Sequence, residues 1–116
     1  MGEEGRGFRY ILDGMNAERI LIASECIGDG KFFVDRASAY AKDRSVFGAP
    51  IGENQGVQFP IARAHVQVTA ANLMVDHAAK LFEAGEPCGS EANMAKMTAS
   101  EASWHAADVC IQTHGG

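Results

Sequence analysis

The sequence predicts an all-α fold, an up-and-down bundle of three long helices. Small and apolar residues recur at alternating steps of three and four in three segments, which is the period of one buried helix face. Stretches rich in Gly, Pro and Asn separate these segments and are expected to end the helices. Alanine and glycine dominate all three stripes, and side chains this small let helix axes approach closely at shallow crossing angles. No segment shows a strand pattern that competes with the helical one.

The first helix is expected to begin near residue 15 and to end in the FGAPIGENQG stretch. Asp13, Gly14 and Asn16 offer capping chemistry just before its stripe, although the start could shift by a turn. Gly28 and Gly30 would each cost a helix up to about 1 kcal/mol relative to alanine, which favours a neighbouring backbone or ligand lying close over simple chance. The stripe of this helix comprises Ile20, Ala23, Ile27, Gly30, Val34, Ala37 and Ala41.

The second helix has the clearest pattern and is expected to close at Gly85 and Pro87. Pro60 lies near its start, where a missing amide proton costs little, so we expect this proline in the first turn. Its stripe comprises Val57, Ile61, Ala64, Val68, Ala71, Val75, Ala78 and Phe82.

The third helix is expected to be capped by Ser90 and to end at Gly115 and Gly116. Three stripes without a fourth helix leave apolar area uncovered, so the chain is expected to self-associate or to be marginally stable. The stripe of this helix comprises Ala92, Ala95, Ala99, Ala102, Ala106, Val109 and Thr113.

Composition limits the classes of function. With 116 residues and 47% hydrophobic content, the chain is long enough for one domain with a core. The formal net charge of −5 disfavours nucleic acid as a partner. Three scattered cysteines fit free, buried thiols better than a disulfide framework. With no signal peptide or membrane span recognised, we expect a soluble protein of the cytoplasm, or of the mitochondrial matrix if eukaryotic.

The common metal and nucleotide motifs do not account for this sequence. The nearest approach to a di-metal Glu-x-x-His pair is Glu101 with His105, which is one residue too far apart. The four histidines show no zinc spacing with one another or with a cysteine, so ordinary surface or core histidines are the better interpretation and no metal is predicted. Rossmann, Walker and nucleophile-elbow patterns are not found.

Three segments resemble the acyl-CoA dehydrogenase family. They are ERILIASECIG on the first helix, YAKDRSVFGAPIGENQGVQF after it, and QTHGG at the end of the third helix. The second segment carries the family's Arg-x-x-Phe-Gly…Gln pattern as Arg44, Phe47, Gly48 and Gln55, and it is the most specific. The resemblance implies an incomplete four-helix-bundle domain over residues 15–116, with residues 1–14 as a residual linker from a missing β-domain. The isolated chain is then expected to be inactive.

The resemblance also implies a reaction. In that family a glutamate abstracts the α-proton of an acyl-CoA thioester, and hydride passes from the β-carbon to FAD. Glu18 matches the position of the base in the isovaleryl and long-chain types, whereas an ordinary glutamate stabilising the first helical turn through the macrodipole is the alternative. Arg19 corresponds to a position in the acyl-CoA pocket, and Asn16 neighbours it, with a solvated arginine and a helix cap as the respective alternatives.

The same resemblance implies that FAD is bound across a subunit boundary. Arg44 matches an arginine that meets the FAD pyrophosphate of a neighbouring subunit, for which a guanidinium fork is well suited, whereas a simple helix-end cation is the alternative. Ser45, Phe47 and Gln55 belong to the same predicted cofactor segment, although an aromatic after a helix is more often a core residue. The remaining predicted FAD-binding residues are Gln112, Gly115 and Gly116, which match the family segment that lines the ADP part of FAD.

Two alternatives remain open on the sequence. A flavin-dependent monooxygenase of the same fold would need no α-proton base, and Glu18 argues against it. A non-catalytic helical module that mediates assembly is the other alternative. Dimers or tetramers of the chain and an electron-transfer acceptor are the further partners that the resemblance implies, and no membrane partner is expected.

Overall fold

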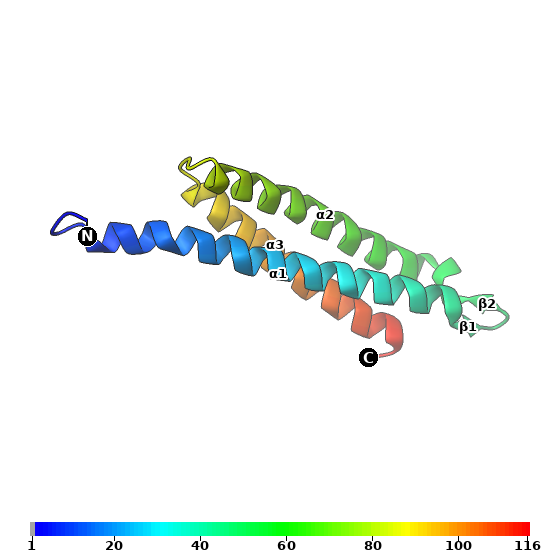
Figure 1. The fold of residues 1–116 in the computed structure, drawn as a ribbon. Coiled ribbons are helices and arrows are strands. Elements are labelled where there is room, and N and C mark those ends of the chain that lie inside the picture. The colour runs from blue at the N-terminus through cyan, green and yellow to red at the C-terminus, as the bar shows by residue number, and fades with distance from the viewer. Residues whose placement is uncertain (1) are drawn as a thin grey trace.

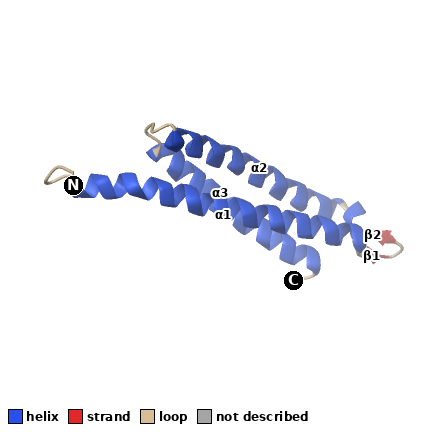
Figure 2. Ribbon diagram, in the orientation of Figure 1, coloured by secondary structure: helices blue, strands red, loops and turns tan. Residues whose placement is uncertain are grey.

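The computed structural model describes residues 2–116 and confirms the all-α bundle of three long helices. The helices are α1 (Gly7–Asp43), α2 (Gln55–Glu83) and α3 (Gly89–His114), running up, down and up (Figure 1). Between α1 and α2 the chain forms two short strands, β1 (Ser45–Val46) and β2 (Ala49–Pro50), and the 3-10 helix η1 (Ile51–Glu53). Figure 2 shows this small hairpin projecting beyond one end of the bundle.

The core is built almost entirely from small side chains. All seven residues of the first predicted stripe are buried in α1, and six of the seven predicted in α3 are buried. In α2 the middle of the stripe is buried, whereas Phe82 is 47% exposed and Leu81 packs against the core instead. The most extensive contact joins α1 to α3, because the alanine stripe of α3 offers little bulk to hold the axes apart.

The start of the first helix was predicted wrongly. It begins at Gly7, with Arg6 at the N-cap position, so Asp13, Gly14 and Asn16 lie inside α1 and do not cap it. Every residue of α1 from Gly7 to Met15 is exposed, and this end extends past the other helices (Figure 1). Helix propagation adds one hydrogen bond per residue, so one glycine in the segment is insufficient to stop it.

Two helix-start details also differ from the predictions. Cys88 occupies the N-cap position of α3, so Ser90 is inside the helix and makes no cap. Pro60 lies in the second turn of α2, where its missing amide proton removes a bond to the carbonyl of Gly56. The helix tolerates this loss because it is near an end and the break affects one carbonyl.

Glycine ends α2 and α3 by the same hydrogen-bond pattern. Gly85 adopts φ 70° and Gly115 adopts φ 103°, a left-handed region that favours glycine. At α3 the amide of Gly115 donates to the carbonyl of Gln112, and that of Gly116 donates to Ile111. The prediction that Gly115 and Gly116 end the third helix is confirmed.

Of the two glycines predicted to mark a close approach, the structure supports one. A Cβ added to Gly30 would lie 2.8 Å from Val68 Cγ2 and 3.6 Å from Ser103 Cα, so all three helices meet at this glycine. A Cβ added to Gly28 would meet nothing within 4 Å among residues 2–116. The predicted close approach of a neighbouring backbone is therefore not seen at Gly28 among these residues.

The cysteines are free, as predicted. Cys88 and Cys110 are buried and Cys26 is half-buried. No helix within residues 2–116 combines the length and apolar character needed to cross a bilayer.

Candidate functional site

The predicted cofactor segment forms a tight hairpin at the end of α1. β1 and β2 pair antiparallel, with Ser45 opposite Pro50 and Val46 opposite Ala49. The two residues between the strands, Phe47 and Gly48, have φ values of 55° and 86°. Positive φ at both central positions is the type I′ turn, whose twist matches that of the paired strands. The sequence analysis did not foresee these strands, because two residues are too few to show a period.

Phe47 is the most unusual residue of this hairpin. Its side chain is 105% exposed, and a bulky residue in the left-handed region is a backbone outlier. Type I′ turns favour Asn, Asp or Gly at this place. The chain therefore holds a large aromatic ring in solvent, in a conformation that destabilises it, which points to a ligand outside residues 2–116.

The hairpin is attached firmly to the last turn of α1. The amide of Arg44 donates to the carbonyl of Tyr40 at 2.8 Å, and the amide of Ile51 donates to the carbonyl of Arg44 at 2.8 Å. A Cβ added to Gly52 would lie 2.9 Å from the carbonyl oxygen of Ala41, so only glycine lets η1 pack this closely. These contacts orient the exposed Arg44 and the hairpin tip relative to the bundle.

The end of α3 docks next to this hairpin. The imidazole of His114 stacks on the ring of Tyr40, with 4.1 Å between centroids and 30° between planes. Nδ1 of His114 lies 2.7 Å from the carbonyl oxygen of Cys110, which holds the imidazole along its own helix. Because Tyr40 is one turn before Arg44 and His114 directly precedes Gly115, the two predicted cofactor segments meet at one end of the bundle.

A pocket connects the same segment of α3 to the start of α2. It has a volume of about 300 Å³, and Gly56, Val57 and Pro60 form its α2 side. Its α3 side comprises Gln112 and Thr113 together with His105, Asp108 and Val109. Gln55, the first residue of α2, is exposed directly beside this pocket wall. A second pocket at this end, between α1 and α2, is lined by residues outside the predicted set. A third, between α1 and the end of α3, includes Gly116 in its lining.

The backbone at this end is open to a ligand. Added Cβ atoms at Gly48, Gly115 and Gly116 would meet nothing within 4 Å among the described residues. The ion pair found in residues 2–116 joins Arg6 to Glu3, so within this part of the chain the guanidinium of Arg44 is not engaged by a carboxylate. An exposed cation, an exposed aromatic ring and uncovered glycine backbone fit an aromatic anion such as a flavin dinucleotide.

The predicted substrate residues lie in the other half of α1. Glu18 is exposed, and Arg19 and Asn16 are half-buried. The guanidinium of Arg19 donates to the side-chain oxygen of Asn16 at 3.0 Å, so Asn16 acts as an acceptor within the helix. An added Cβ at Gly89 would lie 3.8 Å from the amide nitrogen of Asn16, which places the start of α3 beside this pair.

Glu18 is not in the first helical turn. Since α1 begins at Gly7, Glu18 is the twelfth residue of the helix. The macrodipole acts mainly within the first turn, so it does not account for a glutamate at this position. The alternative interpretation of Glu18 as a first-turn stabiliser is therefore wrong.

The predicted site residues fall into two groups that lie far apart on the chain. Arg44, Phe47, Gln55, Gln112 and the final glycines share one end of the bundle, whereas Glu18 is 26 residues before Arg44 on one continuous helix. At 1.5 Å per residue, these two positions are roughly 39 Å apart. The predicted cofactor residues and the predicted substrate residues therefore lie in two separate regions of the chain that do not form a single pocket.

Sequence reasoning missed the contacts that join the cofactor segments. The stacking of Tyr40 on His114 was not predicted, because His114 was interpreted as an ordinary surface or core histidine, and Gly52 was treated only as part of a turn-rich stretch. Their positions could have indicated these contacts, because each of the three residues lies within or next to a predicted cofactor motif. Residues 2–116 contain no cluster of three or more His, Cys, Asp or Glu side chains arranged for a metal ion.

Comparison with known proteins gives a consistent result. Residues 5–116 match the family model of the acyl-CoA dehydrogenase C-terminal domain. The acyl-CoA dehydrogenase fadE12 of Mycobacterium bovis is 41% identical over 118 aligned residues, which cover 100% of this chain and 30% of that protein. The chain thus spans less than a third of the length of this relative.

Solved structures agree with the sequence comparison. Butyryl-CoA dehydrogenase from Megasphaera elsdenii superposes with a TM-score of 0.93 at 31% identity, over 99% of this chain and 30% of that one. The FAD complex of PigA superposes with a TM-score of 0.92 at 28% identity, over 100% of this chain and 30% of that one.

Proposed function

The chain belongs to the acyl-CoA dehydrogenase family, whose C-terminal domain it matches, and from this premise we propose that it serves an FAD-dependent dehydrogenation of an acyl-CoA thioester. One observation carries the proposal. The hairpin that holds Arg44 and Phe47 and the glycine turn that follows Gln112 lie at the same end of the bundle, joined by the stack of Tyr40 on His114.

At that end each side chain has a role in binding FAD. Arg44 would hold the pyrophosphate, for which its guanidinium fork is suited, and the exposed ring of Phe47 would pack on the cofactor. Ser45 and Gln55 would contribute polar contacts on the hairpin side, and Gln112, Gly115 and Gly116 would offer a close backbone surface to the ADP part. The cofactor would supply the acceptor for the hydride that leaves the β-carbon of the acyl chain.

Glu18 is the base of the reaction. Its carboxylate removes the α-proton of the thioester and becomes a neutral carboxylic acid. Arg19 is the next residue after Glu18 on α1, is held by its hydrogen bond to Asn16, and contributes to the acyl-CoA pocket. Since Glu18 is roughly 39 Å from Arg44 along one helix, the flavin that serves Glu18 and the flavin that Arg44 binds belong to different subunits of an oligomer.

The test uses the complete enzyme that contains this chain. Flavin reduction by an acyl-CoA thioester is followed without oxygen in the wild type and in Glu18→Gln. Loss of a positioned general base lowers this rate by about 10²- to 10⁴-fold. Glu25→Gln is the matched control, because Glu25 is an exposed acid two helical turns further along the same helix.

The results separate the assignments. If Glu18→Gln reduces flavin as fast as Glu25→Gln does, Glu18 is not the base. If Arg44→Ala and Phe47→Ala leave the affinity for FAD unchanged, the hairpin is not the cofactor site, whatever the outcome for Glu18.

A further inference from the structure

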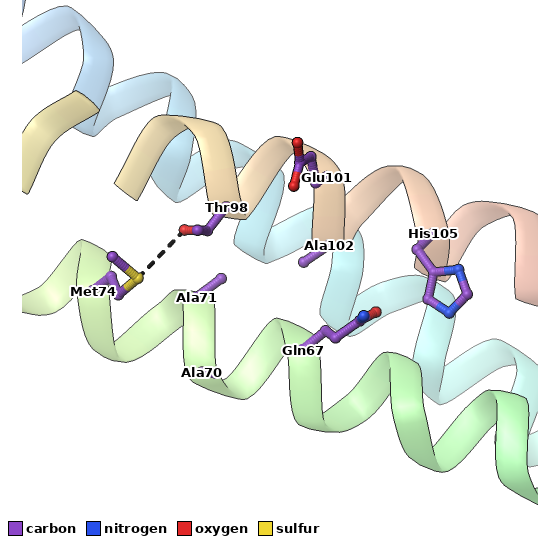
Figure 3. Close-up of a pocket in the computed structure, with 8 residues that line it drawn as sticks. All are labelled: Gln67, Ala70, Ala71, Met74, Thr98, Glu101, Ala102 and His105. Carbon is purple, nitrogen blue, oxygen red and sulfur yellow. Dashed lines mark hydrogen bonds between the residues drawn. The ribbon is translucent and has the colours of Figure 1, made fainter. Parts of the chain in front are cut away.

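Core packing holds α3 in the middle of the bundle but not at the hairpin end. Figure 3 shows one contact of the middle region, where the hydroxyl of Thr98 on α3 lies 3.6 Å from the sulfur of Met74 on α2. The packed cluster of buried side chains ends at Val34 on α1 and at Val109 on α3. From Val34, α1 continues for about two and a half turns toward the hairpin. The predicted FAD-binding residues therefore lie beyond the ends of this cluster.

One pair of rings joins α1 to α3 in this region. The imidazole of His114 stacks on the half-buried ring of Tyr40, with 4.1 Å between centroids and 30° between planes. Ala37 and Ala41 are buried nearby on α1, but each carries a single methyl group and neither belongs to the core cluster. Within residues 2–116 no hydrogen bond joins α3 to the last turn of α1 or to the hairpin. The position of the end of α3 against the hairpin thus depends largely on the two rings.

The imidazole of His114 is held in one orientation. Its Nδ1 lies 2.7 Å from the carbonyl oxygen of Cys110. Because a carbonyl oxygen only accepts, Nδ1 carries the proton and donates this hydrogen bond. The thiol sulfur of Cys110 lies 3.8 Å from the same nitrogen. The ring therefore presents a fixed face to Tyr40.

Each ring is connected directly to a predicted FAD-binding segment. The carbonyl of Tyr40 accepts the amide of Arg44 at 2.8 Å, so a displacement of Tyr40 also displaces Arg44. On the other side, Gly115 follows His114 in the chain, and its amide donates to the carbonyl of Gln112 at 3.1 Å. The stack therefore fixes the position of Arg44 relative to the glycine turn.

We propose that His114 is a positioning residue for FAD, which through its stack on Tyr40 sets the hairpin against the end of α3 before the cofactor binds. The inference rests on the proposed function, in which Arg44 and the segment from Gln112 to Gly116 hold FAD. A ligand that contacts two segments binds more weakly when its binding must also order them. The aromatic ring of His114 is the part that acts, and its hydrogen bond to Cys110 only orients the ring.

Three substitutions of His114 in the complete enzyme test this role. The dissociation constant of FAD is measured by flavin titration of the enzyme freed of its cofactor. His114→Ala removes the ring and raises this constant by about 2- to 12-fold, which is the contribution of one aromatic pair. His114→Gln keeps an amide donor without a ring and weakens binding as His114→Ala does. His114→Phe keeps a ring without the donor and restores the affinity.

Tyr40 provides the second half of the test. Tyr40→Leu weakens FAD binding as His114→Ala does, whereas Tyr40→Phe keeps the ring and the affinity. The double variant of Tyr40→Leu with His114→Ala is no weaker than either single variant, because both remove the same contact. Met74→Ala is the matched control, since it removes a side-chain contact of α3 in the middle of the bundle and leaves the affinity for FAD unchanged.

Flavin reduction separates positioning from chemistry. At saturating FAD, His114→Ala reduces flavin at the wild-type rate, because the substitution affects how tightly the cofactor is held and not the base. The proposal is overturned if His114→Phe fails to restore the affinity, if His114→Gln restores it, or if Met74→Ala weakens binding as much as His114→Ala. Arg44→Ala distinguishes this inference from the function on which it rests. Weaker binding in Arg44→Ala but not in His114→Ala refutes the role of His114 alone, whereas unchanged binding in both refutes the hairpin as the FAD site as well.

Discussion

Alanine substitutions at Gly30 and Gly28 are expected to change stability in opposite directions. The two positions lie two residues apart in the middle of α1, and replacing glycine by alanine in a helix interior stabilises each by about 1 kcal/mol. The packing around them differs. At Gly28 an added Cβ meets nothing within 4 Å among the described residues, so Gly28→Ala raises the free energy of unfolding by about 1 kcal/mol.

At Gly30 the added methyl collides with a stiff neighbour. It would lie 2.8 Å from Val68 Cγ2 and 3.3 Å from Val68 Cγ1, so no rotation of that side chain removes both contacts. Valine in a helix keeps one rotamer in about 90% of cases, and overpacking a core costs about 1–3 kcal/mol. Taking about 2 kcal/mol for the collision, Gly30→Ala lowers the free energy of unfolding by about 1 kcal/mol.

Urea unfolding followed by circular dichroism at the helical band measures both variants. Because the helix-propensity gain is common to the two, their difference of about 2 kcal/mol reports the collision alone. In a Val68→Ala background the methyl added by Gly30→Ala has room, so the same substitution is expected to stabilise. Equal free energies for the two single variants, or destabilisation by Gly30→Ala that persists without the valine methyls, would refute the close approach at Gly30.

Two further predictions concern the hairpin. Phe47→Asn is expected to raise the free energy of unfolding by about 1 kcal/mol, because asparagine tolerates the left-handed region and the exposed ring packs on nothing among residues 2–116. The same change is expected to weaken FAD binding by the complete enzyme; urea unfolding and flavin titration check the two effects, and lower stability would contradict the first. Gly52→Ala is expected to lower the free energy of unfolding by about 1–3 kcal/mol, because the new Cβ would lie 2.9 Å from the Ala41 carbonyl oxygen. The matched control is Gly89→Ala, whose added Cβ would be 3.8 Å from its nearest neighbour and causes no comparable collision. Thermal unfolding compares the two variants, and equal midpoints would contradict the close packing of η1.

Helix identity and most of the core could be predicted from the sequence, because both depend on local spacing. The stripe in α1 was predicted residue for residue, since a helix has one period and a bundle buries one face of it. Helix ends at Gly85 and Gly115 were also predictable, because only glycine takes a left-handed φ without strain. The start of α1 was not, since no strong breaker separates residues 7–14 from the amphipathic segment that follows.

The sequence by itself determined three helices, the residues on their buried faces and the motifs that identify the family. Only the tertiary structure decided that Tyr40 stacks on His114, that Gly30 and not Gly28 marks the close approach, and that η1 packs on the Ala41 carbonyl at Gly52. The physical reason is that periodicity and turn chemistry act over a few neighbouring residues. The level and rotation of one helix against another depend instead on packing between residues far apart in the chain.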